Sequence, residues 1–247
     1  MSCDGWPQKA PQGPHLALRW VFLLGGAKPV ISRLPPWVET GAFTLAFTAG
    51  SVNAVGLLGF SHQAVSHLTG TSTLLGLGMA QLDVLSSVHL LLVILSFVVG
   101  AALSGFLIDS SALQPGRRYG LALLLETSLL LLAMLALQHN SVAGHYLASA
   151  ACGLQNAMVT TYSGAIIRTT HVSGLFTDLG LMLGARLRGQ AIDRRKATLF
   201  LLLIGGFILG GCLGALAFSA LHFQALFLPA TLTAVMALLY HRYLRGG

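Results

Sequence analysis

The sequence predicts an all-α polytopic membrane protein with six transmembrane helices. They form two inverted three-helix repeats, each with a short re-entrant or interfacial segment. Three observations lead to this prediction: a very apolar composition, six long apolar runs, and polar motifs that occur once in each half. Hydrophobic residues make up 55% of the 247 residues, and charged residues only 9%. Because a soluble domain carries about 25% charged residues, this composition excludes the soluble globular class, and its apolar content excludes a disordered chain.

Six apolar runs approach the roughly 20 residues with which a helix crosses about 30 Å of hydrocarbon. In lipid every backbone amide needs an internal partner, so each run is expected to be helical. The predicted spans are Thr40–Phe60, Ser86–Ile108, Tyr119–Leu137, Ala143–Ser163, Ala197–Phe218 and Phe223–Tyr240. Two further apolar stretches, rich in Gly, Ser or Thr, are too short to cross alone: Gly70–Leu82 and Gly174–Leu187.

The positive charges give the predicted orientation. With six spans and both termini in the cytoplasm, the inner segments 1–39, 109–118, 164–196 and 241–247 hold all 14 Lys and Arg residues. An excess of this kind is expected in cytoplasmic loops, and the location predicted is a bacterial inner membrane. The alternative of eight spans, in which both short stretches cross, would place Arg117, Arg118 and Arg168 outside.

The chain divides into three predicted regions. Residues 1–38 form a cytoplasmic or interfacial arm, in which Leu16–Ala27 is apolar but is interrupted by Arg19 and followed by no small-residue cleavage site, so no signal peptide is expected. Residues 39–137 form the first membrane repeat. Residues 138–247 form the second repeat, with a short cytoplasmic tail.

The repeat is visible in an ordered series of motifs. Asn53-Ala54 recurs as Asn156-Ala157. The pattern His-x-Thr/Ser-Gly-x-x-Thr-x-Leu-Gly begins at His67 and again at His171. Because each half has an odd number of spans, successive units must lie in opposite orientations, an arrangement common in transporters and channels. The alternative is that the repeat records only an ancestral duplication, without any transport role.

Small residues recur at every fourth position of the second and fifth spans. Such faces let helix backbones approach closely. We expect close packing of these two symmetry-related helices, with oligomer contacts as the alternative. The residues are Ser96, Gly100, Ser104, Gly206, Gly210 and Gly214.

These motifs resemble the YoaK-like family of small bacterial integral membrane proteins, a family of unknown function. The resemblance covers about Glu39–Tyr240, and members often read Thr-Gly-Asn where this chain has Thr69-Gly70-Thr71. It implies six spans and no settled substrate, reaction or cofactor. The segments that carry it are Gly50–Val55, Ser66–Gly70, Gly153–Ala157, Arg168–Gly174 and Thr177–Gly180.

Several polar residues are candidates for a solute pathway, because ionisable groups at membrane depth are costly. Glu126, near the middle of the third span, is predicted to bind a cation or relay a proton, or else to fix helix packing. Asp178 is predicted to lie in the first turns of a short helix, to complement its dipole or to pair with Arg168. The remaining candidates are Asn53, His67, Thr69, Gly70, Thr73, Asn156, His171, Ser173, Gly174 and Thr177.

The sequence contains no catalytic signature. It has no Gly-x-Ser-x-Gly elbow, phosphate loop, His-Glu-x-x-His or dinucleotide fingerprint, so we expect no enzyme, no catalytic residue and no cofactor. His62 and His67 have a poor spacing for a metal, and no metal site is expected. The expected partners are the bilayer and a small solute or ion, without nucleic acid. The function predicted is a transporter or channel, and the alternative is a non-transport membrane scaffold, sensor or assembly factor.

Overall fold

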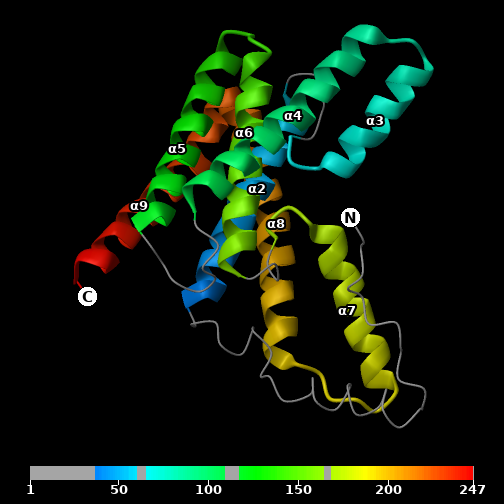
Figure 1. The fold of residues 1–247 in the computed structure, drawn as a ribbon, viewed down its shortest axis with the longest axis vertical. Helices are drawn as coiled ribbons and strands as arrows, with labels where there is room; N and C mark the ends of the chain where they lie inside the picture. The colour runs from blue at the N-terminus through cyan, green and yellow to red at the C-terminus, as the bar shows by residue number, and fades with distance from the viewer. Residues whose placement is uncertain (1–36, 60–64, 109–116, 164–167, 247) are drawn as a thin grey trace, which may run out of the picture. The chain divides into compact units, whose positions relative to one another are not determined.

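A computed structural model describes residues 37–59, 65–108, 117–163 and 168–246, which are helical without any β-strand (Figure 1). This confirms the all-helical part of the fold prediction for those residues. The predicted arm, 1–38, lies almost wholly outside them. In chain order the elements are α2 (Trp37–Leu58), α3 (Leu68–Ala80), α4 (Val84–Leu107), α5 (Arg117–Gln138), α6 (Ala143–Tyr162), α7 (Val172–Leu187), α8 (Arg194–Leu221), the 3₁₀ turn η3 (His222–Leu226) and α9 (Phe227–Gly246).

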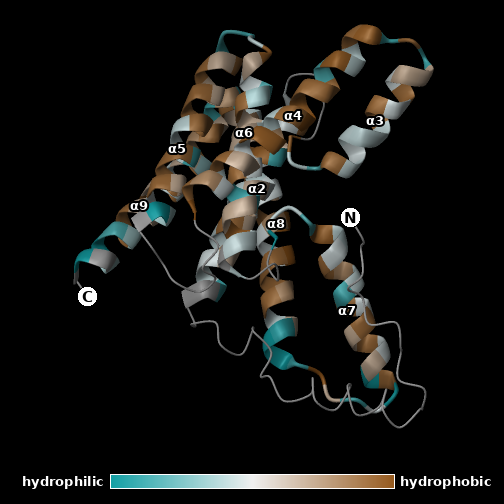
Figure 2. Cartoon of the chain, viewed as in Figure 1, coloured by the Kyte–Doolittle hydropathy of each residue, from teal (hydrophilic) through white to brown (hydrophobic). Residues whose placement is uncertain are grey.

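Within the described residues, four stretches are long and apolar enough to cross a membrane: Glu39–Leu58, Val84–Leu107, Arg118–Gln138 and Arg194–Tyr243. The last of these contains both α8 and α9. Large apolar side chains also cover the outside of the helices, and Phe106 is 85% exposed. Figure 2 shows hydrophobic residues along α4, α5 and α8 and hydrophilic residues at the start of α8 and the end of α9. An apolar surface of this extent indicates an integral membrane protein.

Helix α6 is not among the four stretches, because it carries several polar residues. Its 20 residues correspond to about 30 Å, enough to cross the hydrocarbon layer. It packs against α2, α4 and α5, and its polar side chains Ser149 and Gln155 are buried. Both bond to backbone carbonyls of neighbouring helices, Ser149 Oγ to Val93 and Gln155 Nε2 to Leu45. A helix that is enclosed by other helices makes few contacts with lipid. Polar residues on it therefore cost less stability than polar residues on a helix that faces lipid.

The beginnings of α4 and α8 have the same N-cap. Asp83 accepts a hydrogen bond from the Ser86 amide, and Asp193 accepts one from the Lys196 amide, each 3.1 Å long. Such caps satisfy amides that have no partner within the helix. Because of them, α4 and α8 begin two and three residues earlier than the predicted spans that started at Ser86 and Ala197.

The two small-residue faces do not pack against each other, which differs from our expectation. Instead α8 packs mainly against α2, and α4 packs mainly against α6. Each second helix of one half therefore contacts the first helix of the other half. The Ser96 hydroxyl donates to Leu92 O in its own helix.

Glycine permits the closest approaches in both pairs. A Cβ atom added at any of four glycines would collide with a backbone carbonyl of the facing helix, so only glycine fits there without a shift. The four contacts form two corresponding pairs: Gly50 with Phe207 and Gly153 with Phe97, then Gly210 with Phe47 and Gly100 with Ala150.

The order of contacts along the chain gives the direction of each pair. Ser149 Oγ donates to Val93 O, and Gly153 lies against Phe97 O, so residue numbers rise together along α4 and α6. These two helices are therefore parallel. Along α2 and α8, Gly210 lies against Phe47 and Gly214 against Ser51 in the same manner, so this pair is parallel as well.

Helices α5 and α9 run in opposite directions. The ring centroids of Tyr119 and Tyr240 are 6.4 Å apart, and Thr127 Oγ1 lies 2.8 Å from Thr233 Oγ1. Residue numbers therefore rise along α5 as they fall along α9. Short helices α3 and α7 pack against α4 and α8, respectively. Figure 1 shows these two hairpins extending towards opposite ends of the molecule.

Candidate functional site

The repeated histidine motif has the same geometry in both halves. His67 is the N-cap of α3 and His171 the N-cap of α7, with φ values of −98° and −96° and no side-chain capping bond. Each ring lies against the glycine three residues later. A Cβ at Gly70 would be 3.0 Å from His67 Cδ2, and one at Gly174 would be 2.6 Å from His171 Nε2. The motif therefore places an imidazole over the first turn of each short helix.

The hydroxyl groups of the motif also match. Thr73 Oγ1 donates to Thr69 O and Thr177 Oγ1 donates to Ser173 O, both at 3.0 Å. All four residues are exposed. The Thr73 and Thr177 hydroxyls thus donate within their own helices, and, as at any helix N-terminus, the first backbone amides of α3 and α7 have no intrahelical acceptor.

The paired asparagines have different environments. Asn53 Oδ1 accepts hydrogen bonds from Ser66 Oγ at 3.0 Å and from the Ser66 amide at 3.4 Å, which ties the segment before α3 to α2. In the second half, Asn156 Oδ1 is buried without a hydrogen-bond partner among the described residues, and so is Thr169 Oγ1. Among the described residues, the asparagine of the first half is thus hydrogen-bonded through its side-chain oxygen, whereas that of the second half is not.

Glu126 is the most deeply buried acidic group that the structure describes. It lies in the middle of α5 with 1% of its surface exposed, and its Oε2 has no hydrogen-bond partner there. The neighbouring Thr127 bonds across to Thr233 of α9.

The remaining charged candidates are not brought together. No ion pair joins Arg168 to Asp178 within the described ranges. The ion pair present there joins Arg195 Nε to Glu39 Oε1 at 3.0 Å, between the start of α8 and the start of α2. Asp178 is half-buried on the second turn of α7. The structure therefore separates Glu126 in the bundle from the motif residues on α3 and α7.

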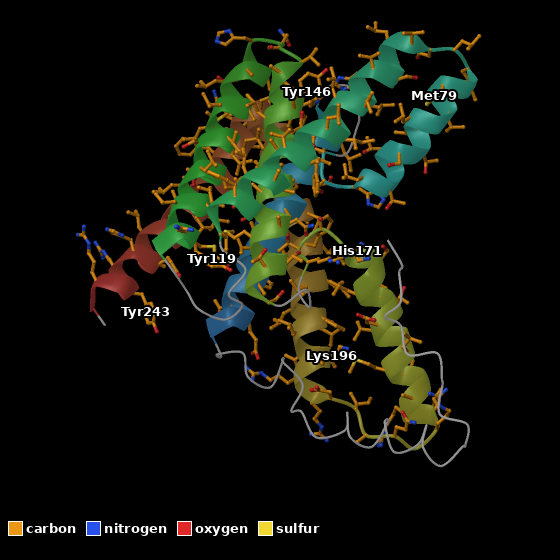
Figure 3. The ribbon with its side chains drawn as sticks, in the orientation of Figure 1. Met79, Tyr119, Tyr146, His171, Lys196 and Tyr243 are labelled. Atoms are coloured by element: carbon orange, nitrogen blue, oxygen red, sulfur yellow. The ribbon has the colours of Figure 1, made fainter. Side chains whose placement is uncertain are left out.

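Sequence reasoning missed a polar cluster at the beginning of α4 and α6. His89 Nδ1 lies 3.0 Å from Tyr146 Oη, and the ring centroids of His89 and His145 are 5.6 Å apart. His145 is buried, and Figure 3 labels Tyr146 at this end of the bundle. The pairing spans 57 positions, so no local spacing signals it. Its only sequence signal is that both helices begin with titratable or hydroxyl-bearing rings.

A cavity of about 560 Å³ lies elsewhere, among α2, α5, α6 and α9. Its walls are almost entirely apolar, and they include Leu45, Leu123, Val159 and Leu239. None of the candidate pathway residues lines it. No group of three metal-ligating side chains occurs within the described residues.

Comparison with known families matches residues 41–239 to the family described as "Protein of unknown function (DUF1275)". The chain belongs to the DUF1275 family. The match covers the whole helical bundle from the first turns of α2 to α9, so the expectation of a family of unknown function is confirmed, whereas the YoaK-like name is not. No curated protein and no solved structure matches the chain.

Proposed function

We propose that this DUF1275 protein is a transporter or channel for a small polar or ionic solute. Its six spans form two inverted three-span repeats, 39–137 and 138–247, with both termini in the cytoplasm. The first amides of α3 and α7 hold the solute, and Glu126 couples its movement to protons or to a cation. The protein is not an enzyme in this proposal, and its partners are the bilayer and the solute.

The directions of the helix pairs support six alternating spans. In a chain of six alternating spans, odd-numbered spans run one way and even-numbered spans the other. The pairs α2 with α8 and α4 with α6 would then each be parallel, and the pair α5 with α9 would be antiparallel. The observed contacts have these directions. The two corresponding pairs of glycine contacts further support a relation by two-fold symmetry between the halves.

The single observation that carries the proposal is Glu126. A carboxyl group buried inside a membrane-spanning bundle is costly, and it is usually retained for an ion or proton pathway. The hydrogen bond between α5 and α9 is made by Thr127, so that contact does not involve Glu126. Among the described residues, Glu126 Oε2 has no hydrogen-bond partner, which supports a role in holding a proton or a cation.

Proton flux into liposomes tests this role. The full chain is reconstituted with the dye pyranine inside, and a pH gradient is applied with potassium and valinomycin to collapse the membrane potential. We expect faster acidification than in empty liposomes, a loss of about tenfold or more in Glu126→Gln, and a smaller loss in Asp178→Asn. Ser128→Ala is the matched control, because Ser128 Oγ only bonds to Leu124 O of its own helix. Unchanged flux in both acidic variants would refute the coupling.

Sidedness of the short helices tests the inverted repeat separately. Single cysteines replace Thr73 or Thr177 in a chain without Cys3, Cys152 and Cys212, and intact cells are treated with an impermeant thiol reagent. We expect labelling of Thr73→Cys from outside and of Thr177→Cys only after permeabilisation. Labelling of both from the same side would contradict the six-span inverted arrangement.

One observation favours the alternative of a non-transport scaffold, sensor or assembly factor. The cavity among α2, α5, α6 and α9 is apolar and contains none of the candidate pathway residues. The alternative predicts no flux of protons, potassium or chloride above that of empty liposomes. It also predicts a stable partner recovered by crosslinking through the spans.

A further inference from the structure

The cavity described above has a chemical character different from that of the candidate pathway. Its lining comes from the beginnings of α2 and α5 and from the ends of α6 and α9, so it lies at one end of the bundle. Its volume of about 560 Å³ is within the range of small-molecule sites. Because most of its lining is leucine, valine, methionine, alanine and tyrosine, with Thr40 and Thr44 the other polar residues, a hydrocarbon chain fits it better than a polar solute.

Tyrosines mark the mouth of this cavity. Three of the five tyrosines in the chain line it: Tyr119, Tyr240 and Tyr243. Figure 3 shows Tyr119 and Tyr243 at the end where α5 begins and α9 ends. Tyrosine is enriched where hydrocarbon meets lipid headgroups, because its ring is apolar and its hydroxyl is polar. The cavity therefore begins at headgroup depth and extends into the apolar layer.

Exposed arginines lie next to the lining tyrosines in the sequence. Arg118 directly precedes Tyr119, and Arg242 and Arg245 flank Tyr243 on the last turns of α9, and all three arginines are exposed. Glu39, beside the lining residue Thr40, is the nearby acidic group, and its charge is paired with Arg195. Basic groups beside an apolar cleft at this depth favour an anionic headgroup.

We propose that this cavity binds an acyl chain of an anionic phospholipid, with the phosphate held by Arg118, Arg242 and Arg245. The lipid enters from the bilayer leaflet that meets this end of the bundle. This site is independent of the transport proposal. It requires only that the helices lie in a membrane.

Native mass spectrometry of the full chain tests the proposal. The protein in detergent is mixed with phosphatidylglycerol or with phosphatidylcholine of the same chains, and the bound fraction of each is measured. We expect a preference for phosphatidylglycerol that falls about fivefold for each arginine replaced by glutamine. Equal binding of both lipids by the unmodified protein would overturn the proposal.

A cavity-filling variant tests the acyl-chain part. Gly41 lines the cavity and has open space around its Cβ position, so Gly41→Phe places a ring inside. We expect binding of both lipids to fall at least fivefold. Gly105→Phe is the matched control, because Gly105 also has open space but lies on α4 away from the cavity, and it retains binding. Undiminished binding in Gly41→Phe would overturn the site.

A crosslinking measurement needs no variant. Phosphatidylglycerol with a diazirine near the end of one chain is photolysed with the unmodified protein, and the modified peptides are mapped. We expect adducts within residues 40–45 and 236–243, the stretches of α2 and α9 that contribute to the cavity lining. Adducts concentrated instead on the exposed apolar faces of α4 and α8 would overturn the proposal.

Discussion

At the residue scale, glycines at the helix crossings have the clearest structural role. Gly210 lies against the Phe47 carbonyl, whereas Gly205 on the same helix has open space around its Cβ position. Both are glycines in α8, so they share the same effect of helix propensity. They differ in that a backbone carbonyl of α2 faces Gly210 and no atom lies near the Cβ position of Gly205. The effect of this difference on stability can be measured.

We predict that Gly210→Ala lowers the stability of the protein and that Gly205→Ala does not. The added methyl group at position 210 forces α2 and α8 apart, an overpacking that costs about 1–3 kcal/mol. At position 205 the same change removes only a poor helix former, so stability is unchanged or slightly higher. Thermal unfolding of both variants in one detergent measures this. Equal melting temperatures would show that the close crossing is not maintained in solution.

The two asparagines give a second residue-scale prediction. Asn53→Leu leaves the Ser66 amide and hydroxyl without their acceptor, so we expect a loss of about 1 kcal/mol. Asn156→Leu removes a buried acceptor that has no partner among the described residues, so we expect no loss or a small gain. Unfolding in detergent compares the two variants. A larger loss for Asn156→Leu than for Asn53→Leu would contradict the asymmetry between the halves.

The N-cap of α4 gives a pH-dependent prediction. Hydrogen bonds from the Ser86 hydroxyl and then from its amide hold the pKa of Asp83 below its ordinary value of 3.8. A lowered folded-state pKa adds stability that is complete above the unfolded value and is lost as the pH falls through the folded value. We therefore expect the stability difference between the unmodified protein and Asp83→Asn to shrink below about pH 3.8. A difference that stays constant across that range would refute the cap as an ionised group.

At the element scale, the antiparallel contact of α5 with α9 joins the third helices of the two halves. We predict that cysteines replacing Thr127 and Thr233 form a disulfide on oxidation, because their hydroxyl oxygens are 2.8 Å apart. The matched control pairs Thr127→Cys with Thr231→Cys, which is exposed and bonds within α9. Gel mobility before and after reduction reports both. Crosslinking of the control pair alone would show a different rotation of α9.

Local patterns of the sequence predicted the elements better than their partners. Apolar length found the long helices α2, α4, α5, α6, α8 and α9, and the repeated His-x-Thr/Ser-Gly motif found the starts of α3 and α7. The partner of each small-residue face was not predictable, since Gly100 and Gly210 fit any helix that offers a close backbone. For the same reason, the contact between His89 and Tyr146 depended on long-range packing that no spacing encodes.

At the scale of the whole molecule, the two halves depend on each other. The first helix of each half covers the glycine face on the second helix of the other half. We predict that residues 1–137 and 138–247, expressed as separate chains in the same cells, associate and remain stable. Either piece alone exposes a glycine groove and is degraded. Co-purification through a tag on one piece measures this, and stable accumulation of a single piece would contradict the mutual dependence.

The corresponding glycine crossings also bear on how such a chain arises. An interface in which the first helix of one unit fits the second helix of its copy is self-complementary, which is the defining property of a two-fold homodimer. A single three-helix unit able to insert in both directions already has the surface needed to pair with itself. In the proposed inverted arrangement, fusion keeps both orientations in one molecule and removes the requirement that two separate copies insert in equal numbers.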